Sequence, residues 1–490
     1  MPQFFLKNKL NEILKYIKNN KIELFLLVLI YLSMCCFIFV KIIPKMFYIH
    51  NFEQILFHLN QPLGGTDPEL IKKLISRILR YSTLYFLVFL LIFKVIFLNF
   101  KSKFKNYFLI ISAILLPIFI TFYCFKLFEI NDYLKSKNEN TPFSTYYEKN
   151  YVHPTSDKIK FNKKKNLIIL YLESFENSYY KKTGLFTENL VPKIEKLSED
   201  NISFTGFNQV AGTGWTIAGI FASNCGIPIK SIVDPNGYRN VKYFFKNVTC
   251  LPEILKKNGY KTYYLQGADI KFAGKDKFFA QHGMDEFYGQ DYFAKLPSYN
   301  ESQDGDWGIN DHTIFQHAKE KIKEISKNKD QPFMFTMLTV DTHHSEGFLN
   351  PVCESKFDIG MKNTLYCQDK LISNFINWLK TQEFYKNTSI VIIGDHLAMP
   401  NTLDDYIHKN KNREIINIFI NSEKPSQNLN RKFTTFDLFP TILESIGAES
   451  PKLGLGRSLF SDEKTLIEEE GYKKFNKKIY EKSKLYESFR

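Results

Sequence analysis

Two apolar segments, far apart in the chain, each end in residues that bind divalent metal ions. The first begins at Leu167 and ends at Glu173 (LIILYLES), and the second begins at Ser389 and ends at Asp395 and His396 (SIVIIGDH). Two carboxylates and an imidazole offer the oxygen and nitrogen ligands that suit Zn²⁺ or Mn²⁺. These three side chains predict one metal site, provided that the two segments lie close together in the fold.

A threonine framed by glycines lies between these two segments. Residues 212–228 are GTGWTIAGIFASNCGIP, in which a Gly212-Thr213-Gly214 turn precedes an apolar run. This pattern predicts a helix with Thr216 in or near its first turn. Amides at the start of a helix can hold a phosphate, and a threonine hydroxyl bound to a metal there is a plausible nucleophile. The combination predicts a phosphoryl-transfer site.

Strands that end at one edge of a sheet would bring these residues together. Both apolar segments are typical of short, fully buried strands. From residue 166 onward, strand-like runs alternate with helical ones, which predicts an α/β fold with a mainly parallel sheet sandwiched by helices. Ligands of such sheets bind beyond the carboxyl ends of the strands. The predicted strands are 167–172, 202–207, 261–265, 332–339, 389–393 and 415–420. The predicted helices are 190–199, 215–224, 251–258, 309–326, 363–381 and 435–446.

Three apolar runs in the N-terminal part are long enough to cross a bilayer, namely 23–43, 83–100 and 106–128. The second is the shortest and contains Lys94. The stretch 44–62 is too polar to span and suits an interfacial or re-entrant helix. The first run is long and no small-residue cleavage site follows it, so a cleavable signal peptide is not expected.

These runs divide the chain into four expected parts. They are a transmembrane helical domain (1–128), a linker (129–165), an extracytoplasmic catalytic domain (166–462) and a charged C-terminal tail (463–490). Lysines gather before the first span and in the loop after the second, which the positive-inside rule assigns to the cytoplasm. Three spans then place the catalytic domain on the other side of the membrane.

The net charge of +14 does not indicate nucleic-acid binding. The lysines are scattered, and they are not interleaved with aromatic residues as in single-strand binders. The tail suits a mixed-charge amphipathic helix, for which a solvated face is the simpler interpretation and contact with anionic lipid headgroups the sharper one.

Four of the seven cysteines lie in the expected catalytic domain. An even number there suits two disulfides in an oxidising compartment. Proximity in sequence favours the pairs Cys225–Cys250 and Cys353–Cys367. The alternative is four free buried thiols in a cytoplasmic domain.

The catalytic region resembles a known family along much of its length. The segments that carry the resemblance are LYLESFE, GTGWTIAGIFASNCGIP, QGADIKFAGKDKFFAQHGMDEFYG, DWGIND, TVDTHH, GDHLAMPN and GLGRS. They resemble bacterial phosphoglycerol transferases of the type that modifies periplasmic glucans, within the alkaline phosphatase/sulfatase superfamily. Lipoteichoic acid synthases are a related branch. The resemblance covers roughly residues 60–460 and keeps the order of the motifs.

The resemblance implies a multi-pass enzyme of the bacterial inner membrane with a periplasmic catalytic domain. Such an enzyme takes sn-glycerol 1-phosphate from phosphatidylglycerol in the lipid bilayer and releases diacylglycerol. It places the group on a hydroxyl of a glycan acceptor, through a covalent intermediate on a threonine. One divalent metal is implied, with Mn²⁺ favoured by analogy and Mg²⁺ and Zn²⁺ left open. The acceptor glycan and the oligomeric state also stay open.

The resemblance assigns the metal site residue by residue. Glu173, Thr216, Asp395 and His396 fall on the metal ligands, with Thr216 as the nucleophile. His343, in TVDTHH, matches the histidine that contacts the phosphate or the leaving group. Without the resemblance, a glutamate at a strand end is usually a surface residue, and a threonine in a first helical turn is usually a cap.

Further residues are candidates for binding the substrate. In related transferases the region corresponding to 266–289 supplies aromatic and basic side chains to the phosphoglycerol head, which here suggests Phe272, Lys275 and Lys277, beside His282. Trp215 precedes the nucleophile and either lines the pocket or packs in the core. His344 is adjacent to His343, and neighbours on an extended segment point to opposite faces, so we expect only one of the two histidines to face the site.

Three alternatives share some of these features. A phosphoethanolamine transferase would have the same metal ligands and membrane anchor, but the sequence after Thr216 and the number of disulfides disfavour it. A sulfatase activity is disfavoured because the chain has no C-x-P-x-R motif for a formylglycine nucleophile. A catalytically inactive sensor of lipid headgroups is disfavoured by the full set of metal ligands.

Overall fold

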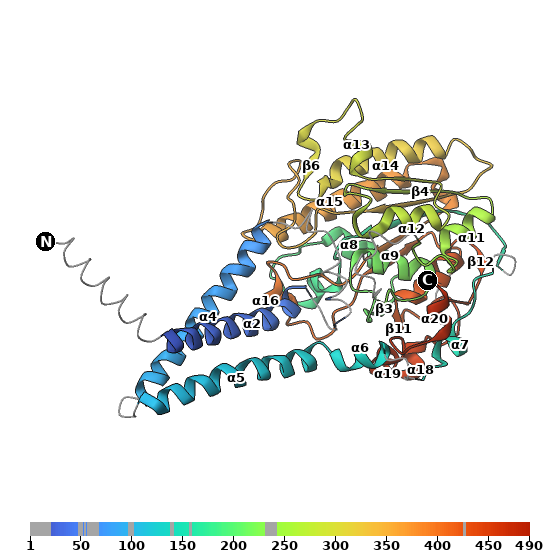
Figure 1. Cartoon of the computed structure of the whole chain (residues 1–490). Coiled ribbons are helices and arrows are strands. Elements are labelled where there is room, and N and C mark those ends of the chain that lie inside the picture. Colours follow the sequence, from blue (N-terminus) through green and yellow to red (C-terminus); the bar gives the residue numbers. More distant parts are fainter. Residues whose placement is uncertain are drawn as a thin grey trace. The chain divides into compact units, whose positions relative to one another are not determined.

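The computed structural model describes residues 21–47, 52, 55, 68–96, 102–137, 142–155, 159–230, 243–424 and 428–490. They form two compact units, one of N-terminal helices up to Leu134 and one that holds Lys135–Arg490 (Figure 1). The segment 44–62, predicted as an interfacial or re-entrant helix, lies largely outside the described residues.

Three long helices make up the N-terminal unit. They are α2 (Lys21–Phe47), α4 (Pro68–Ile96) and α5 (Ser102–Leu127). Each contains a stretch long and apolar enough to cross a membrane, with mean hydropathies of 2.7, 1.8 and 2.5 in chain order. The second expected span, 83–100, differs most from the structure, because α4 already begins at Pro68 and its apolar stretch is Leu74–Val95.

These helices bury little of their apolar surface against one another. Ile30 of α2 and Leu109 of α5 belong to a small shared core. By contrast, Leu91 of α4 and Phe122 of α5 are 63% and 74% exposed. Apolar side chains that stay exposed around a helix are stable in lipid but not in water. The N-terminal unit is therefore a membrane anchor.

A six-stranded, mainly parallel sheet forms the centre of the second unit and confirms the predicted α/β fold. The strand order is β10-β9-β2-β8-β4-β5. Only β10 (Asn417–Ile420), at one edge, runs antiparallel to its neighbour. The three strands β2 (Asn166–Leu172), β8 (Phe333–Leu338) and β9 (Thr388–Gly394) are buried along their whole length. Burial on both faces explains why their sequences are continuously apolar.

Helices cover both faces of this sheet (Figure 1). The helices on one face are α8 (Pro192–Asp200), α14 (Asp311–Ile325) and α15 (Gly360–Lys380). They share a core with alternate strand residues such as Ile168 and Leu170. Tyr171, which follows Leu170, points to the other face, where its hydroxyl lies 2.7 Å from the Ser223 hydroxyl of α9 (Thr216–Cys225). Strand residues thus alternate between two helical layers.

The prediction differs from the structure at β3 and β5, among other strands. The segment 202–207 overlaps β3 (Thr205–Asn208), which pairs in parallel with β11 (Asn430–Thr434) in a separate small sheet. The local pattern predicted a strand but could not identify its partner. The edge strand β5 (Glu286–Tyr288) pairs with β4 (Lys261–Gln266), and its three half-buried residues are too few to give an alternating pattern.

The segment after the membrane anchor and the C-terminal tail pack on each other. Tyr147, on α7 (Tyr146–Asn150), is buried and its hydroxyl donates to the carbonyl oxygen of Ile479 at 2.7 Å. The tail is not the single amphipathic helix that we expected. Gly471 has a positive φ of 79° and separates two of its three short helices. These are α18 (Leu466–Glu470), α19 (Tyr472–Lys478) and α20 (Lys484–Ser488).

Two disulfides join the same cysteines that the sequence suggested. Cys225 and Cys250 link the end of α9 to the residue before α11 (Leu251–Lys257), and Cys353 and Cys367 link a loop to α15. The first disulfide fixes the far end of the helix that begins at Thr216. A cross-link of this kind stabilises the fold chiefly by restricting the unfolded chain.

Candidate active site

The carboxyl ends of β2 and β9 bring Glu173, Asp395 and His396 together. The two strands are parallel neighbours in which Leu172 lies opposite Gly394, so the residues that follow lie side by side. One ligand atom from each side chain lies within 4.8 Å of the other two, and all three side chains are buried. Residues distant in sequence thus form one cluster at the sheet edge where α/β proteins bind ligands.

Backbone amides orient the carboxylate of Asp395. Its Oδ1 accepts hydrogen bonds from the amides of Ser174 and His396, both at 2.8 Å. Ser174 has a positive φ of 58°, which is uncommon for a residue other than glycine. The Ser174 hydroxyl also donates to Glu173 Oε1 at 2.7 Å. The turn after β2 therefore fixes both carboxylates.

Two atoms of the cluster, one on His396 and one on Asp395, have no hydrogen-bond partner in the protein. The Nδ1–H of His396 donates to the Leu397 carbonyl oxygen at 2.8 Å, so Nε2 is the ring nitrogen left to bind a metal ion. This Nε2 lies 3.4 Å from both Glu173 Oε1 and Asp395 Oδ2. Neither it nor Asp395 Oδ2 forms a hydrogen bond. Buried polar atoms are rarely left unsatisfied, so this donor set fits a divalent cation.

The pKa values of the three groups reflect this concentration of negative charge. Burial and the neighbouring Glu173 raise the pKa of Asp395 to about 8. Burial lowers the pKa of His396, but Asp395 and Glu173 outweigh it and raise that pKa to about 9. Burial likewise opposes the ionisation of Glu173, but His396 keeps its pKa below the usual range. The cluster attracts positive charge, which a metal ion would supply.

Thr216 begins helix α9, as the glycine-framed turn predicted. Its hydroxyl donates to Glu173 Oε2 at 3.2 Å, and the residue is only half-buried, whereas the rest of α9 is buried. The helix lies very close to the cluster, because a Cβ on Gly219 would come within 2.0 Å of the Asp395 carbonyl oxygen. Only glycine fits there, so Gly219 allows Thr216 to lie next to the cluster.

Phe272 lies in the turn that leads into α12 (Lys275–Gln281), and Lys275 is the first residue of that helix. Ala273 has a positive φ of 57° in this turn. Lys275 is 3% exposed, and its Nζ lies 5.1 Å from the centre of the Phe272 ring. Burial lowers the pKa of Lys275 to about 8, although the carboxylate of Glu173 opposes this shift. The ammonium is therefore a buried positive charge within the electrostatic field of the cluster.

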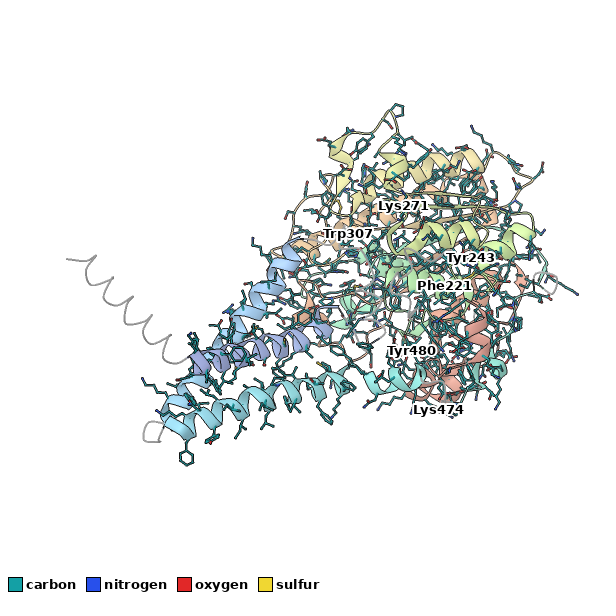
Figure 2. The ribbon with its side chains drawn as sticks, in the orientation of Figure 1. Phe221, Tyr243, Lys271, Trp307, Lys474 and Tyr480 are labelled. Carbon is teal, nitrogen blue, oxygen red and sulfur yellow. A yellow bond between two sulfur atoms is a disulfide. The ribbon has the colours of Figure 1, made fainter. Side chains whose placement is uncertain are left out.

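His343 and His344 do not point to opposite faces, contrary to expectation. Their rings stack with centroids 4.2 Å apart, because β8 ends at Leu338 and the following residues form turns. The ring of Trp307, which is labelled in Figure 2, also lies against His343, with centroids 3.9 Å apart. Burial lowers the pKa of His343 despite the nearby Glu173.

Trp307 is a candidate site residue that the sequence prediction missed. It packs against His343 and also lies 6.3 Å from Phe272, centroid to centroid. The DWGIND motif contained the available signal, but no role was assigned to its tryptophan. Trp215, which was a candidate, is 7% exposed and precedes α9. It therefore lies largely in the protein interior.

A buried carboxylate positions the loop after β8. Asp311 accepts a hydrogen bond from the Asp341 amide at 2.8 Å, and Asp341 accepts one from the Asp311 amide at 3.1 Å. The same loop supports Glu173, because Thr339 Oγ1 accepts from its amide at 3.1 Å and Thr342 Oγ1 donates to its carbonyl at 2.7 Å. Asp311 therefore holds the loop whose Thr339 and Thr342 form hydrogen bonds to Glu173, and it affects the cluster only through that loop.

A buried ion pair braces the loops that carry the metal-type ligands. Glu176 is fully buried and accepts hydrogen bonds from Arg413 Nε and from the Ala398 amide, both at 2.9 Å. Arg413 also donates to the Ala398 carbonyl oxygen at 2.8 Å. Glu176 follows Glu173, and Ala398 follows His396, so the pair connects both loops. Arg413 is a single arginine in a polar stretch, and nothing in the local sequence indicated this role.

A second group of ligand-type residues, Cys250, Glu253 and His282, lies elsewhere in the same unit. The Cys250 sulfur is engaged in a disulfide. His282 has an oxygen close to each ring nitrogen, with Glu253 Oε1 2.8 Å from Nδ1 and the Phe244 carbonyl oxygen 2.7 Å from Nε2. The ligand-type atoms of Cys250 and His282 thus already have partners within the protein, and His282 does not belong to the candidate active site.

Comparison with known protein families shows that the Sulfatase family matches residues 165–448. This range contains every residue of the cluster, as well as Thr216, Lys275 and His343.

The chain is also similar to curated relatives. It is 36% identical over 337 residues to phosphoglycerol transferase I of Escherichia coli (strain K12) and equally so to that of Shigella flexneri. The match covers 67% of this chain but 42% of each relative. The chain thus matches less than half the length of these relatives.

Two solved structures share the fold. A protein of the alkaline phosphatase superfamily from Vibrio parahaemolyticus has a TM-score of 0.51 at 22% identity, over 69% of this chain and 78% of that one. The lipoteichoic acid synthase LtaP from Listeria monocytogenes also has a TM-score of 0.51, at 19% identity, over 62% of this chain and 80% of that one.

Proposed function

This chain belongs to the sulfatase family, and we propose that it transfers glycerol phosphate from phosphatidylglycerol to a hydroxyl of a glycan. Its similarity to phosphoglycerol transferase I of Escherichia coli supports the identity of the transferred group. The membrane anchor supports a lipid donor, because the donor lies in the bilayer.

One observation carries this proposal. The Thr216 hydroxyl lies 3.2 Å from Glu173 Oε2, beside a buried cluster in which Asp395 Oδ2 and His396 Nε2 have no protein partner. The Glu173 carboxylate thus contacts the hydroxyl of the proposed nucleophile and also belongs to the proposed cation site. This arrangement suits displacement at phosphorus, in which the attacking oxygen must be activated and negative charge must be stabilised.

In the first half-reaction, Thr216 Oγ forms a bond to phosphorus while the bond to the diacylglycerol oxygen breaks. Glu173 orients the hydroxyl, and its Oε2, which accepts the hydrogen bond of Thr216, takes up the Thr216 proton. That proton passes to the diacylglycerol oxygen, so that diacylglycerol leaves as an alcohol. Thr216 then carries glycerol phosphate as a phosphodiester. Lys275 provides positive charge for the phosphoryl oxygens.

In the second half-reaction, a glycan hydroxyl attacks the same phosphorus and Thr216 leaves. Burial lowers the pKa of His343, so the imidazole is neutral at pH 7 and can accept the proton of the attacking hydroxyl. Thr216 regains a proton as its bond to phosphorus breaks. Trp307 packs on His343 and would keep its ring in place during this step.

Glu173, Asp395, His396 and Thr216 would hold one divalent metal ion. When bound, this ion would lower the pKa of the Thr216 hydroxyl and neutralise charge on the phosphoryl oxygens. We favour Mn²⁺, with Mg²⁺ and Zn²⁺ as alternatives, since carboxylate and imidazole ligands accept all three.

We further propose that the catalytic unit lies in the periplasm of a bacterial inner-membrane protein. Lysines before the first span and after the second favour the cytoplasmic side for those segments. A reporter fused after residue 128 should then be active only in the periplasm, and one fused near residue 103 only in the cytoplasm. The opposite pattern would refute this orientation and the donor reaction proposed for that face of the membrane.

Donor specificity tests the proposed activity. Purified full-length protein should release diacylglycerol from labelled phosphatidylglycerol but not from labelled phosphatidylethanolamine. Thr216→Ala should abolish the release. Preference for phosphatidylethanolamine would identify a phosphoethanolamine transferase instead, and binding of lipid without turnover would identify a headgroup sensor.

A further inference from the structure

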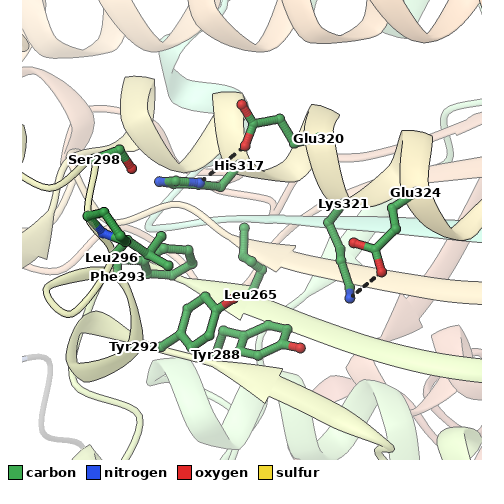
Figure 3. Close-up of a pocket in the computed structure, with 11 residues that line it drawn as sticks. Leu265, Tyr288, Tyr292, Phe293, Leu296, Ser298, His317, Glu320, Lys321 and Glu324 are labelled. Atoms are coloured by element: carbon green, nitrogen blue, oxygen red, sulfur yellow. Dashed lines mark hydrogen bonds and ion pairs between the residues drawn. The ribbon is translucent and has the colours of Figure 1, made fainter.

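A cavity of about 290 Å³ lies at the β5 edge of the sheet (Figure 3). Its walls come from the ends of β4 and β5, from α13 (Gln290–Phe293) and from the middle of α14. None of the metal-type ligands lines it. The residues that matter for its chemistry are Tyr288, Tyr292, Phe293, His317, Glu320 and Lys321.

One side of this cavity is aromatic and open to solvent. The rings of Tyr288 and Tyr292 lie 4.3 Å apart, centroid to centroid, and Tyr292 is 45% exposed. Phe293 is buried beneath them and packs against the His317 ring at 4.8 Å. Large, partly exposed aromatic faces provide flat apolar contact area for a ligand.

The other side carries charge that the protein has already paired. Lys321 Nζ lies 3.1 Å from Glu286 Oε2 and 3.2 Å from Glu324 Oε1. Its ammonium also lies 5.8 Å from the centre of the Tyr288 ring. Glu320 lies next to His317, with Oε2 3.6 Å from Nδ1. The carboxylates of Glu286, Glu320 and Glu324 thus outnumber the single ammonium group of Lys321, so this side of the cavity is net negative.

This chemistry narrows the class of ligand. Excess negative charge disfavours a phosphate or another anion. The position over Tyr288 that a cationic ligand would take is held by Lys321. An uncharged molecule with an apolar face and many hydroxyl groups satisfies both sides, because its face can stack on Tyr292 and its hydroxyls can donate to the carboxylates.

We propose that this cavity binds an uncharged sugar residue of the acceptor glycan. The choice of ligand rests on the proposed function, in which a glycan is the acceptor. The volume is close to the lower end of the range for small-molecule sites, about 300 Å³, and suits a sugar unit rather than a long chain. The cavity is therefore a subsite that selects the acceptor and takes no part in bond formation.

Helix α13, which supplies part of the cavity wall, contacts the segment that precedes Phe272 and Lys275. The Gln290 amide donates to the Ala268 carbonyl oxygen at 3.1 Å, and Asp291 Oδ2 lies 3.5 Å from Lys271 Nζ. Helix α14 makes a second connection, because it begins at Asp311 and reaches His317 after a rise of about 9 Å. The cavity and the candidate active site thus share supporting elements.

Binding of a neutral sugar tests the inference directly. The full-length protein in detergent is titrated with a β-linked glucose tetrasaccharide, and binding is followed by saturation-transfer NMR and calorimetry. Wild type should bind it saturably, and Tyr292→Ala should weaken binding about tenfold, since the stacking face is lost. Tyr243→Ala is the matched control, because Tyr243, which is labelled in Figure 2, is 46% exposed and is not one of the residues that line the cavity. Its affinity should equal that of wild type.

Further measurements separate this inference from the proposed function. Thr216→Ala should bind the tetrasaccharide normally, and in the absence of any acceptor Tyr292→Ala should release diacylglycerol at the wild-type rate. With the tetrasaccharide as acceptor, Tyr292→Ala should raise KM about tenfold and leave kcat unchanged. If wild type binds the sugar through Tyr292 but releases no diacylglycerol, the proposed function fails and the cavity inference stands. Absence of binding, equal binding by Tyr292→Ala, or displacement by tetramethylammonium would overturn the inference.

Discussion

The catalytic unit has two groups of residues of the types that bind metals, namely Glu173, Asp395 and His396, and Cys250, Glu253 and His282. The ligand-type atoms within each group lie similarly close together, but their hydrogen bonds differ. In the first, His396 Nε2 and Asp395 Oδ2 are buried and lack a protein partner. In the second, both ring nitrogens of His282 lie within 2.8 Å of an oxygen, and the sulfur of Cys250 is in a disulfide. Unsatisfied buried atoms, rather than residue types, therefore distinguish a candidate metal site from a structural one.

Their positions in the fold explain this difference. The first group follows the ends of two parallel strands, where the chain must turn and polar side chains converge. In the second group, Cys250 and Glu253 lie at the start of α11, where Glu253 Oε1 accepts a hydrogen bond from the Cys250 amide at 3.3 Å. A carboxylate used to cap a helix has little capacity left for a metal ion.

Removing a ligand from the first group should have the largest effect. Asp395→Ala or His396→Ala should lower phosphatidylglycerol turnover by at least about 10⁴-fold, because the cation site and its charge stabilisation are lost together. Metal content measured by mass spectrometry should fall to background in the same samples. Normal metal content in either variant would exclude that residue as a ligand.

Breaking the buried ion pair beside the cluster should have the next largest effect, on stability. Arg413→Ala leaves Glu176 charged and buried, which should reduce the free energy of unfolding by about 3–5 kcal/mol. Denaturant titration of the catalytic unit within the full chain measures this. Lys163→Ala is the control, because Lys163 pairs with Glu423 at 2.8 Å with its side chain 66% exposed. Its loss should cost less than about 1 kcal/mol. Equal effects would refute the bracing role.

Lys275 should affect both the rate and its pH dependence. Lys275→Ala should lower kcat/KM about 10²-fold, since a charge near the phosphoryl group is lost. Burial lowers the pKa of this lysine to about 8, so the cation is present below that pH and is lost as the pH rises through it. The wild-type rate should therefore fall above pH 8, and Lys275→Arg should move this fall to higher pH. A profile unchanged by Lys275→Arg would assign the titration to another group.

The second group should show the smallest effect. His282→Ala removes contacts to Glu253 and to the Phe244 carbonyl oxygen and should reduce the free energy of unfolding by about 1–3 kcal/mol. Metal content and turnover at a temperature below unfolding should not change. Loss of bound metal from this variant would break the distinction between the two groups.

The ligands were predictable from the sequence because each directly follows a strand with a continuous apolar pattern. Glu173 follows β2, and Asp395 and His396 follow β9, so strand prediction and the geometry of parallel sheets sufficed. The same reasoning located Thr216, since its glycine-framed turn marks the start of a helix. The resemblance to a known family added Lys275 and His343, which carry no such local pattern.

The remaining features depend on tertiary contacts. The prediction that His343 and His344 point to opposite faces was wrong. Side chains alternate between faces only in a strand, and β8 ends before these two residues. Arg413 and Trp307 reach the site from irregular segments with no periodicity. The β3 strand was recognisable, but its pairing with β11 is a long-range choice that local sequence does not encode.

The central claim is that Thr216 forms a covalent bond with the transferred group, and the donor half-reaction tests it most directly. The full-length enzyme is incubated with phosphatidylglycerol in the absence of any acceptor, and its peptides are then analysed by mass spectrometry. The account predicts a glycerophosphoryl group on the peptide that contains Thr216, together with released diacylglycerol. Thr216→Ala should lose both but still bind metal, because the side chains of Glu173, Asp395 and His396 remain, whereas Thr216→Ser should keep part of the activity because the hydroxyl remains. Release of diacylglycerol by Thr216→Ala at the wild-type rate would contradict the two-step mechanism.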